Sequence, residues 1–165
     1  MSHDRPVLLI DSNVWLDHYS GDRPGSADAT ALITYADARG LTLAYPASCI
    51  KDVYYLIAQS LKRQYRQERG ALTEEAARAC NECAWESARN LATIAVAVPV
   101  GEAEVWLACQ LKELHGDLED DLVLAALESS QADFLVTGDA VLRDKAPRGA
   151  FAARDMLAYL RAREG

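Results

Sequence analysis

Two kinds of hydrophobic pattern alternate along the chain. Short, unbroken apolar runs of strand length occur at Val7 to Ile10 and at Phe134 to Val136. Between them lie longer segments in which apolar residues recur every three or four positions, for example Ile50, Val53 and Ile57. Unbroken runs are typical of strands buried on both faces, and the three-to-four spacing is typical of amphipathic helices. The pattern therefore predicts strands that alternate with helices.

These patterns divide the chain into expected elements. Strands are predicted at residues 7–10, 41–45, 94–98 and 133–137, with a weak edge strand at 149–151. Helices are predicted at residues 14–19, 26–39, 47–65, 73–92, 101–115, 117–130 and 154–163. Because strand and helix alternate throughout, we expect an α/β fold with a central parallel sheet of four to five strands flanked by helices. No repeat or linker interrupts the order, so residues 1–165 are expected to form a single domain, with a core at about residues 6–161.

The overall charge narrows the classes of function. Seventeen Lys and Arg residues stand against twenty-five Asp and Glu residues, which gives a net charge of −8. Such an acidic chain is not a simple electrostatic binder of nucleic acid, although a bound cation would attract phosphates locally. The chain shows no signal-peptide core, and its apolar runs are far below the ~20 residues of a membrane span. A soluble cytoplasmic protein with no membrane contact is expected.

Several conspicuous residue types carry no clear chemistry. The spacing of Cys80 and Cys83 resembles a metal pair, but no second pair or nearby His completes a zinc site. Small, mostly buried thiols are therefore expected for the four cysteines, which are Cys49, Cys80, Cys83 and Cys109. The three histidines are scattered, which favours surface or loop roles over catalysis. Core packing is the expected role of the three tryptophans, Trp15, Trp85 and Trp106.

Residues 62–69, Lys-Arg-Gln-Tyr-Arg-Gln-Glu-Arg, form the one locally basic stretch. Cations favour the C-terminal end of a helix through the macrodipole, so a solvated helix end is one interpretation. The other interpretation is a contact with nucleic acid or a protein partner, since Tyr65 can stack and arginines can pair with phosphates. The sequence leaves both interpretations open.

The strongest chemical signal is a set of four aspartates, Asp11, Asp52, Asp120 and Asp139, at the ends of hydrophobic runs. A carboxylate just past a parallel strand lies at the sheet edge where open α/β folds bind ligands. Several carboxylates gathered there repel one another and lose hydration, which is tolerable mainly when a cation lies among them. An all-oxygen donor set suits Mg²⁺ or Mn²⁺. The chain is thus predicted to hold a hard divalent metal.

Each acid also has a purely structural explanation. Asp11 fits a helix cap, Asp139 a turn residue after Gly138, and Asp52 a solvated position on its helix. Among the acids of residues 117–121, Asp120 shares a helical face with Val123, Leu124 and Leu127 and is preferred. Asp121 is rotated by about 100° toward a less apolar face and is kept in reserve as a supporting acid. Asp117 is expected to cap this helix.

Four blocks in order carry a family resemblance: residues 9–14 (Leu-Ile-Asp-Ser-Asn-Val), 48–52 (Ser-x-x-x-Asp), 117–120 (Asp-Leu-Glu-Asp) and 136–139 (Val-Thr-Gly-Asp). Together they resemble a PIN domain, and residues 151–160 resemble that family's closing helix. The resemblance covers about residues 6–161. The second block departs from the family, which more often has Glu where this chain has Asp52.

The resemblance implies an Mg²⁺- or Mn²⁺-dependent ribonuclease, a hydrolase, of the kind found as the VapC toxin of a toxin–antitoxin pair. It makes Asp11, Asp52, Asp120 and Asp139 the catalytic and metal-binding acids, with Asn13 and Thr137 as supporting polar residues. RNA is the implied substrate and an antitoxin protein the implied partner, and a homodimer is compatible with it. Two alternatives remain: a phosphatase or DNA nuclease that uses the same acids, and a non-catalytic binding module that keeps the fold.

Overall fold

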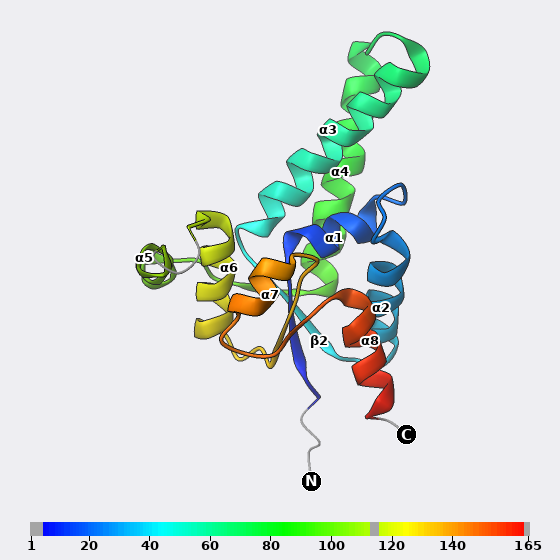
Figure 1. Cartoon of the computed structure of the whole chain (residues 1–165). Helices are drawn as coiled ribbons and strands as arrows, with labels where there is room; N and C mark the ends of the chain where they lie inside the picture. Colours follow the sequence, from blue (N-terminus) through cyan, green and yellow to red (C-terminus); the bar gives the residue numbers. More distant parts are fainter. Residues whose placement is uncertain (1–4, 113–115, 164–165) are drawn as a thin grey trace.

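The structure, a computed structural model, describes residues 5–112 and 116–163. Within these residues five strands lie among eight helices (Figure 1). The strands are β1 (Val7–Ile10), β2 (Thr42–Pro46), β3 (Val96–Val98), β4 (Phe134–Val136) and β5 (Ala150–Phe151). The helices are α1 (Ser12–Tyr19), α2 (Ser26–Ala38), α3 (Cys49–Arg69), α4 (Glu74–Ile94), α5 (Glu102–Leu111), α6 (Leu118–Ser129), α7 (Ala140–Lys145) and α8 (Ala153–Ala162).

All strand pairs of the sheet are parallel, and the strand order is β3-β2-β1-β4-β5. The central strand β1 pairs with β2 through Leu8 and Leu43 and with β4 through Leu9 and Leu135. From β1 the chain first adds β2 and β3 on one side and later adds β4 and β5 on the other. The order therefore reverses between β1 and β4, and the carboxyl ends of these two strands form the topological switch point of the sheet.

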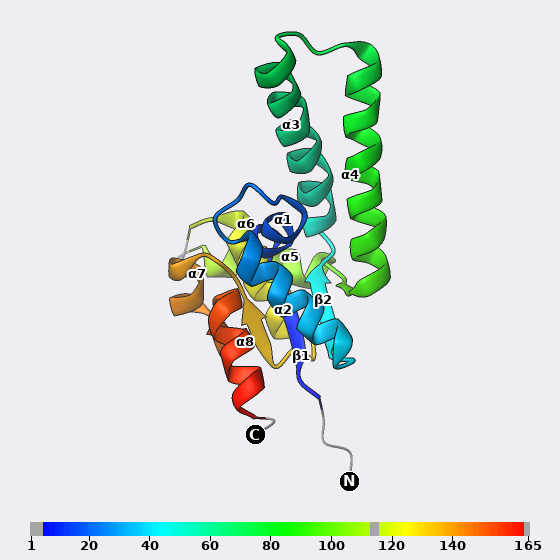
Figure 2. The ribbon, with the colours of Figure 1, turned by 90° about the vertical axis from the view of Figure 1, so that its right-hand side faces the viewer.

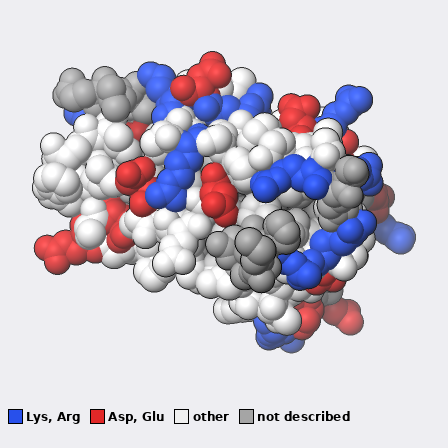
Figure 3. All heavy atoms as spheres, turned by 90° about the horizontal axis from the view of Figure 1, so that it is seen from below, with Lys and Arg blue, Asp and Glu red and all other residues white. Residues whose placement is uncertain are grey.

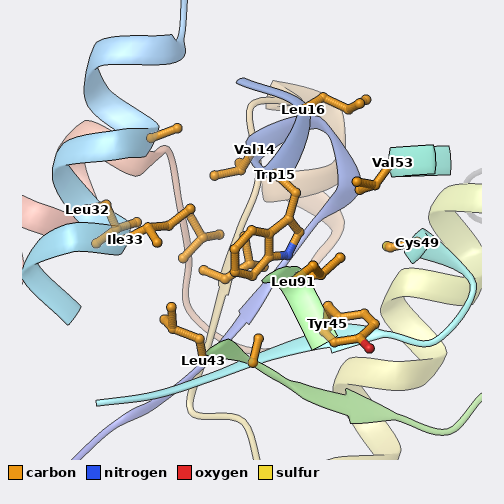
Figure 4. Packing of buried hydrophobic residues seen from close by; sticks show 14 of the residues in the cluster. Val14, Trp15, Leu16, Leu32, Ile33, Leu43, Tyr45, Cys49, Val53 and Leu91 are labelled. Carbon is orange, nitrogen blue, oxygen red and sulfur yellow. The ribbon is translucent and has the colours of Figure 1, made fainter. Parts of the chain in front are cut away.

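Alternate residues of each strand enter two separate cores. Leu8 and Ile10 face the larger core with α1, α2, α3, α4 and α8, whereas Leu9 faces the smaller core with α6 and α7. Because both faces of the sheet are covered, its strands read as continuous apolar runs. The expected α/β class is confirmed. Trp15 fills the centre of the larger core, surrounded by Leu32, Ile33, Leu43 and Leu91 (Figure 4).

Several local expectations differ from the structure. Helix α7 was not expected, because its six residues are too few to show a helical period. Two of the tryptophans predicted to lie in the core are exposed instead: Trp85 by 49% and Trp106 by 65%. Cys83 and Cys109 are likewise exposed, while the other two cysteines are buried. The expected helix end at residue 115 lies outside the described residues. Within the described part of the chain, no helix is long and apolar enough to cross a membrane.

Helices α3 and α4 form a hairpin that projects from the body of the molecule (Figures 1 and 2). Each has 21 residues, which corresponds to a length of about 31 Å. Helix α3 ends at Arg69, beyond its expected end at residue 65, and Gly70 caps it with a φ of +83° that suits a residue without a side chain. Tyr54 and Trp85 hold the two helices together near the body, with ring centroids 4.9 Å apart. The basic stretch at residues 62–69 is therefore helical and lies on the outer half of the hairpin.

Substitution by Ala should destabilise the protein by different amounts at two leucines of the same helix. Leu127 of α6 is fully buried, while Leu118 at the start of α6 is 60% exposed. Leu127→Ala should lower the free energy of unfolding by about 2–5 kcal/mol, since it removes buried methyl groups and leaves a cavity. Leu118→Ala should change it by less than about 0.5 kcal/mol. Urea unfolding followed by circular dichroism measures both, and equal losses would contradict this assignment of the smaller core.

Candidate active site

Asp11 occupies the switch point directly after β1. It is the N-cap of α1, and its Oδ1 accepts a hydrogen bond from the Ser12 amide at 2.6 Å. Its Oδ2 accepts from Asn13 Nδ2 at 2.7 Å and from the Thr137 hydroxyl at 2.8 Å. Only 4% of Asp11 is exposed. The capping role considered from the sequence is correct for Asp11, and the same carboxylate also faces the neighbouring strand end.

A polar network ties the ends of β1 and β4 together. The Thr137 hydroxyl, which is fully buried, accepts from Asn13 Nδ2 at 3.1 Å and from the Asp139 amide at 3.1 Å. Asn13 Oδ1 accepts from the Gly138 amide at 2.9 Å. These bonds hold the Asp11 side chain in one orientation. The structure thus brings Asn13 and Thr137 against Asp11, at the place where supporting residues were expected.

Beside Asp11 lies an open hollow of about 190 Å³, here called the acidic hollow. Its lining comes from the end of β1 and from the first turns of α1, α3 and α6. The lining residues are Asp11, Ser12, Asn13, Ser48, Cys49, Asp52, Glu119, Asp120 and Val123. Three of the four predicted aspartates therefore share one concave surface, although up to 109 positions separate them in the sequence.

A lysine partly neutralises this surface. Lys51 Nζ lies 2.5 Å from Asp52 Oδ1 and 3.5 Å from Glu119 Oε1. The hydrogen bond to Asp52 raises the pKa of the Lys51 ammonium, which is therefore charged at neutral pH. The Lys51 side chain is 60% exposed, whereas that of Asp52 is 18% exposed. The ammonium thus lies on the solvent side of the Asp52 carboxylate.

Two groups of the hollow have raised pKa values. Burial raises the pKa of Asp11, and the nearby charge of Asp139 raises it further, against the lowering effect of its hydrogen bonds. Burial likewise raises the pKa of the Cys49 thiol, with the charges of Asp11 and Asp52 as further causes. A negative charge is thus unfavourable here, so a bound cation would be favoured.

Asp139 stands apart from the described residues that line the hollow. It is exposed, and its Oδ1 caps α7 by accepting from the amides of Val141 and Leu142 at 2.7 and 3.0 Å. It is connected to Asp11 through Thr137, and its charge is close enough to affect the pKa of Asp11. Like Asp11, it is both a helix cap and a carboxylate at the switch point.

The two neighbouring acids of α6 differ in position. Asp117 caps the helix as expected, and it accepts from the amides of Glu119 and Asp120. Asp120 is half-buried and lines the acidic hollow. Asp121 is only 1% exposed and is not among the described residues of the lining. The expectation that Asp121 lies on a less buried face than Asp120 is therefore wrong, while the choice of Asp120 for the hollow agrees with the geometry.

The oxygen atoms that the hollow offers are of the type that a hard divalent ion binds. Asp11, Asp52, Asp120 and Glu119 offer carboxylate oxygens, which Mg²⁺ and Mn²⁺ prefer. Among the described residues, however, no three His, Cys, Asp or Glu side chains are grouped closely enough to hold an ion as they stand. Like charges that share a site are unfavourable without a cation between them.

A family profile described as a PIN domain matches residues 7–140. The chain belongs to the PIN-domain family. Its members are nucleases that generally use divalent metals. The matched span includes strands β1 to β4, the switch point and every residue of the acidic hollow. The family resemblance seen in the four sequence blocks is thereby confirmed.

One similar solved structure is the crystal structure of VapBC2 from Rickettsia felis bound to a DNA fragment from their promoter. It superposes on this PIN domain with a TM-score of 0.57 and 11% sequence identity, covering 88% of this chain and 98% of that one. At this identity the likeness concerns the fold alone. Among curated proteins, none matches the chain.

Sequence reasoning missed two residues of this PIN domain's hollow. Glu119 lies in the acidic run of α6, but its neighbour Asp120 alone was chosen. Lys51 was not considered, although a Lys directly before a candidate ligand is the signal that could have found it. Both residues lie on the first turn of a helix, where side chains at adjacent positions point in directions about 100° apart. The packing of the helices then determines which of these side chains face the hollow.

The switch-point network makes Thr137 a critical polar residue of the PIN domain. Thr137→Val keeps the shape but removes the hydroxyl shared by Asp11, Asn13 and Asp139, so it should lower the free energy of unfolding by about 1–3 kcal/mol. Thr137→Ser keeps the hydroxyl and should lose less, about 0.8 kcal/mol for one buried methyl group. Urea unfolding of both variants is the measurement. A valine variant at least as stable as the serine variant would contradict the importance of the network.

Proposed function

We propose that this PIN domain is a metal-dependent endoribonuclease that acts in the cytoplasm as the toxin of a toxin–antitoxin pair. The observation that carries the proposal is the meeting of Asp11, Asp52 and Asp120 in one hollow at the switch point of the sheet. Helix capping does not require the aspartates to converge, since Oδ1 of Asp11 alone accepts the hydrogen bond from the first amide of α1. Its second oxygen belongs to the network that faces β4.

In this proposal Asp11, Asp52 and Asp120 hold one or two Mg²⁺ or Mn²⁺ ions, and Asp139 supports them from the edge of the site. The bound ion supplies charge for a phosphoryl oxygen and makes a water more acidic. Asn13 and Thr137 keep the Asp11 carboxylate in place for the ion. Asp121, which is buried next to Asp120, serves the packing of α6 beneath the site.

Lys51 is assigned a second task in the proposed reaction. Its ammonium balances the negative charge of Asp52 and Glu119 while no cation is bound. If Asp52 held an ion, the exposed Lys51 side chain would be available to contact a phosphate group of the substrate. In this exchange Asp52 keeps a positive partner, first the ammonium and then the ion.

Two considerations bear on the substrate and the partner, which we propose to be RNA and an antitoxin. The nuclease character of the family supports phosphodiester hydrolysis. The fold likeness to the VapBC2 structure supports an antitoxin partner and a homodimer as its form of assembly. DNA and small phosphoesters are the competing substrates, and a module that binds without cleaving is the competing function. Cleavage and metal binding, measured separately, distinguish these functions.

Metal dependence is the first test of the proposal. Purified protein should cleave single-stranded RNA in the presence of Mg²⁺ or Mn²⁺ and stop when a chelator is added. Asp11→Asn should lower the cleavage rate by about 100-fold or more, since one donor of the ion site is lost. Gel assays with labelled RNA, with DNA and with a chromogenic phosphoester measure the rates. Cleavage that persists in the chelator, or faster hydrolysis of DNA, would contradict the proposal.

The two acids of α6 give a matched pair for metal binding. Mn²⁺ should raise the midpoint of thermal unfolding of the wild type, because an ion that binds only the folded state stabilises it. Asp120→Asn should lose most of this shift, whereas Asp121→Asn should keep it but start from a lower midpoint, because Asp121 is buried. Thermal unfolding with and without Mn²⁺ measures the shift. Loss of the shift in Asp121→Asn alone would reverse the assignment.

A further inference from the structure

Helix α3 carries an exposed stripe that continues from the acidic hollow along the hairpin. The residues three, four, seven, eleven and fourteen positions after Asp52 share its helical face. They are Tyr55, Leu56, Gln59, Arg63 and Arg66, here called the α3 stripe. All five are exposed, Tyr55 by 66% and Leu56 by 45%. A large aromatic ring and two arginines therefore lie in solvent on the same side of the helix as a proposed metal ligand.

The opposite face of α3 is the one that packs. Ile57 is buried in the larger core, and Leu61 and Tyr65 line a groove that α3 shares with α4. The two helices lie side by side along the whole hairpin (Figure 2). In the helical projection these packed positions lie roughly opposite Asp52. The α3 stripe is thus turned away from α4; its residues are exposed, and the Tyr55 ring meets the neighbouring Tyr54 ring with centroids 5.0 Å apart.

The charge of α3 differs from that of the rest of the chain. The helix holds five Lys or Arg residues and two acidic residues, a net charge of +3 in a protein of net charge −8. On the opposite helix, Arg78 and Arg89 each pair with a glutamate of α4. Arg63 and Arg66 form no ion pair with any described residue. The face of the molecule seen in Figure 3 mixes basic and acidic side chains, whereas the α3 stripe beyond Asp52 carries positive charge alone.

From this placement we propose that the α3 stripe binds the RNA strand on one side of the scissile phosphate. Tyr55 stacks on a base beside the hollow, and Arg63 and Arg66 contact phosphates farther along the strand. At a rise of 1.5 Å per residue, these side chains start about 4.5, 17 and 21 Å along the helix axis from Asp52, so they meet different nucleotides. The inference rests on the proposed function and names how its substrate is held.

A single strand of nucleic acid matches these residues better than a protein surface does. Aromatic stacking combined with cations that follow the backbone is the usual way to hold a single strand without sequence preference. The acidic hollow repels phosphates until a cation is bound, so the rest of the strand needs a separate positive surface. The α3 stripe is a basic surface that begins at the hollow itself.

Binding is tested with two pairs of matched variants made in the inactive Asp11→Asn protein. Arg63→Gln with Arg66→Gln removes two charges from the α3 stripe, and Arg78→Gln with Arg89→Gln removes two from α4. Tyr55→Ala removes the ring, and Tyr55→Phe keeps it. Fluorescence anisotropy of a labelled single-stranded RNA of mixed sequence, with Mg²⁺ and over a range of salt, gives the dissociation constants. Circular dichroism and thermal unfolding verify that each variant is folded.

The α3 double variant should bind about tenfold more weakly at about 0.15 M salt, and its salt slope should fall by about 1.4, the value for two lost phosphate contacts. Tyr55→Ala should bind about tenfold more weakly. The α4 double variant and Tyr55→Phe should stay within about twofold of their parent. With Asp11 restored, the same losses should appear in KM for cleavage more than in kcat.

Failure of this inference differs from failure of the proposed function. Wild-type protein that cleaves no RNA contradicts the proposed function. Wild-type protein that cleaves RNA, while the α3 double variant and Tyr55→Ala bind and cleave it as well as their parents, contradicts the α3 stripe alone. That outcome would assign the exposed face of α3 to a protein partner. Equal losses in the α3 and α4 variants would also contradict it, since they would reflect net charge and not position.

Discussion

A carboxyl group that is buried at the end of the central strand needs hydrogen-bond partners, and donors from three residues converge on Asp11 at the edge of this sheet. Asp11 receives donors from its own helix start and from Thr137 on the neighbouring strand. Burial raises the pKa of Asp11, and the hydrogen bonds from Thr137 and Ser12 work in the opposite direction. A bound cation would favour the charged form of Asp11 against the cost of burial. The hydrogen bonds that orient Asp11 at the sheet edge therefore also serve the proposed metal site.

Most of the fold follows from the hydrophobic pattern of the sequence. The runs at Val7–Ile10 and Phe134–Val136 are apolar at every position because one strand supplies both cores, and this predicts a covered parallel sheet. Helix α7 and the exposure of Trp85 and Trp106 could not be predicted in the same way. A six-residue helix shows no period, and an aromatic residue at a helical position has the same spacing whether its face packs or meets solvent.

Only part of the candidate site could be predicted from the sequence. Asp11 and Asp139 follow strands directly, so their position at one sheet edge follows from topology. Asp52 and Asp120 lie within helices, and only the packing of α3 and α6 brings them to the hollow. Asp120 lines the hollow, but the more buried of the two acids is Asp121, because an acid can be buried among neighbouring elements that the sequence of its own helix does not reveal. The catalytic roles of these acids remain predictions.

The bond between Thr137 and Asp11 spans 126 positions of the chain. A ribosome therefore has to deliver a further 126 residues after Asp11 before the acidic edge can close, since Thr137 follows β4. Until then the first strand can pair with β2, but it lacks β4 and the hydroxyl donor of its carboxylate. Closing so long a loop is also slow in folding terms. During synthesis the acidic edge is thus one of the later parts of the domain to form, because its hydrogen bonds join the first strand to the end of β4.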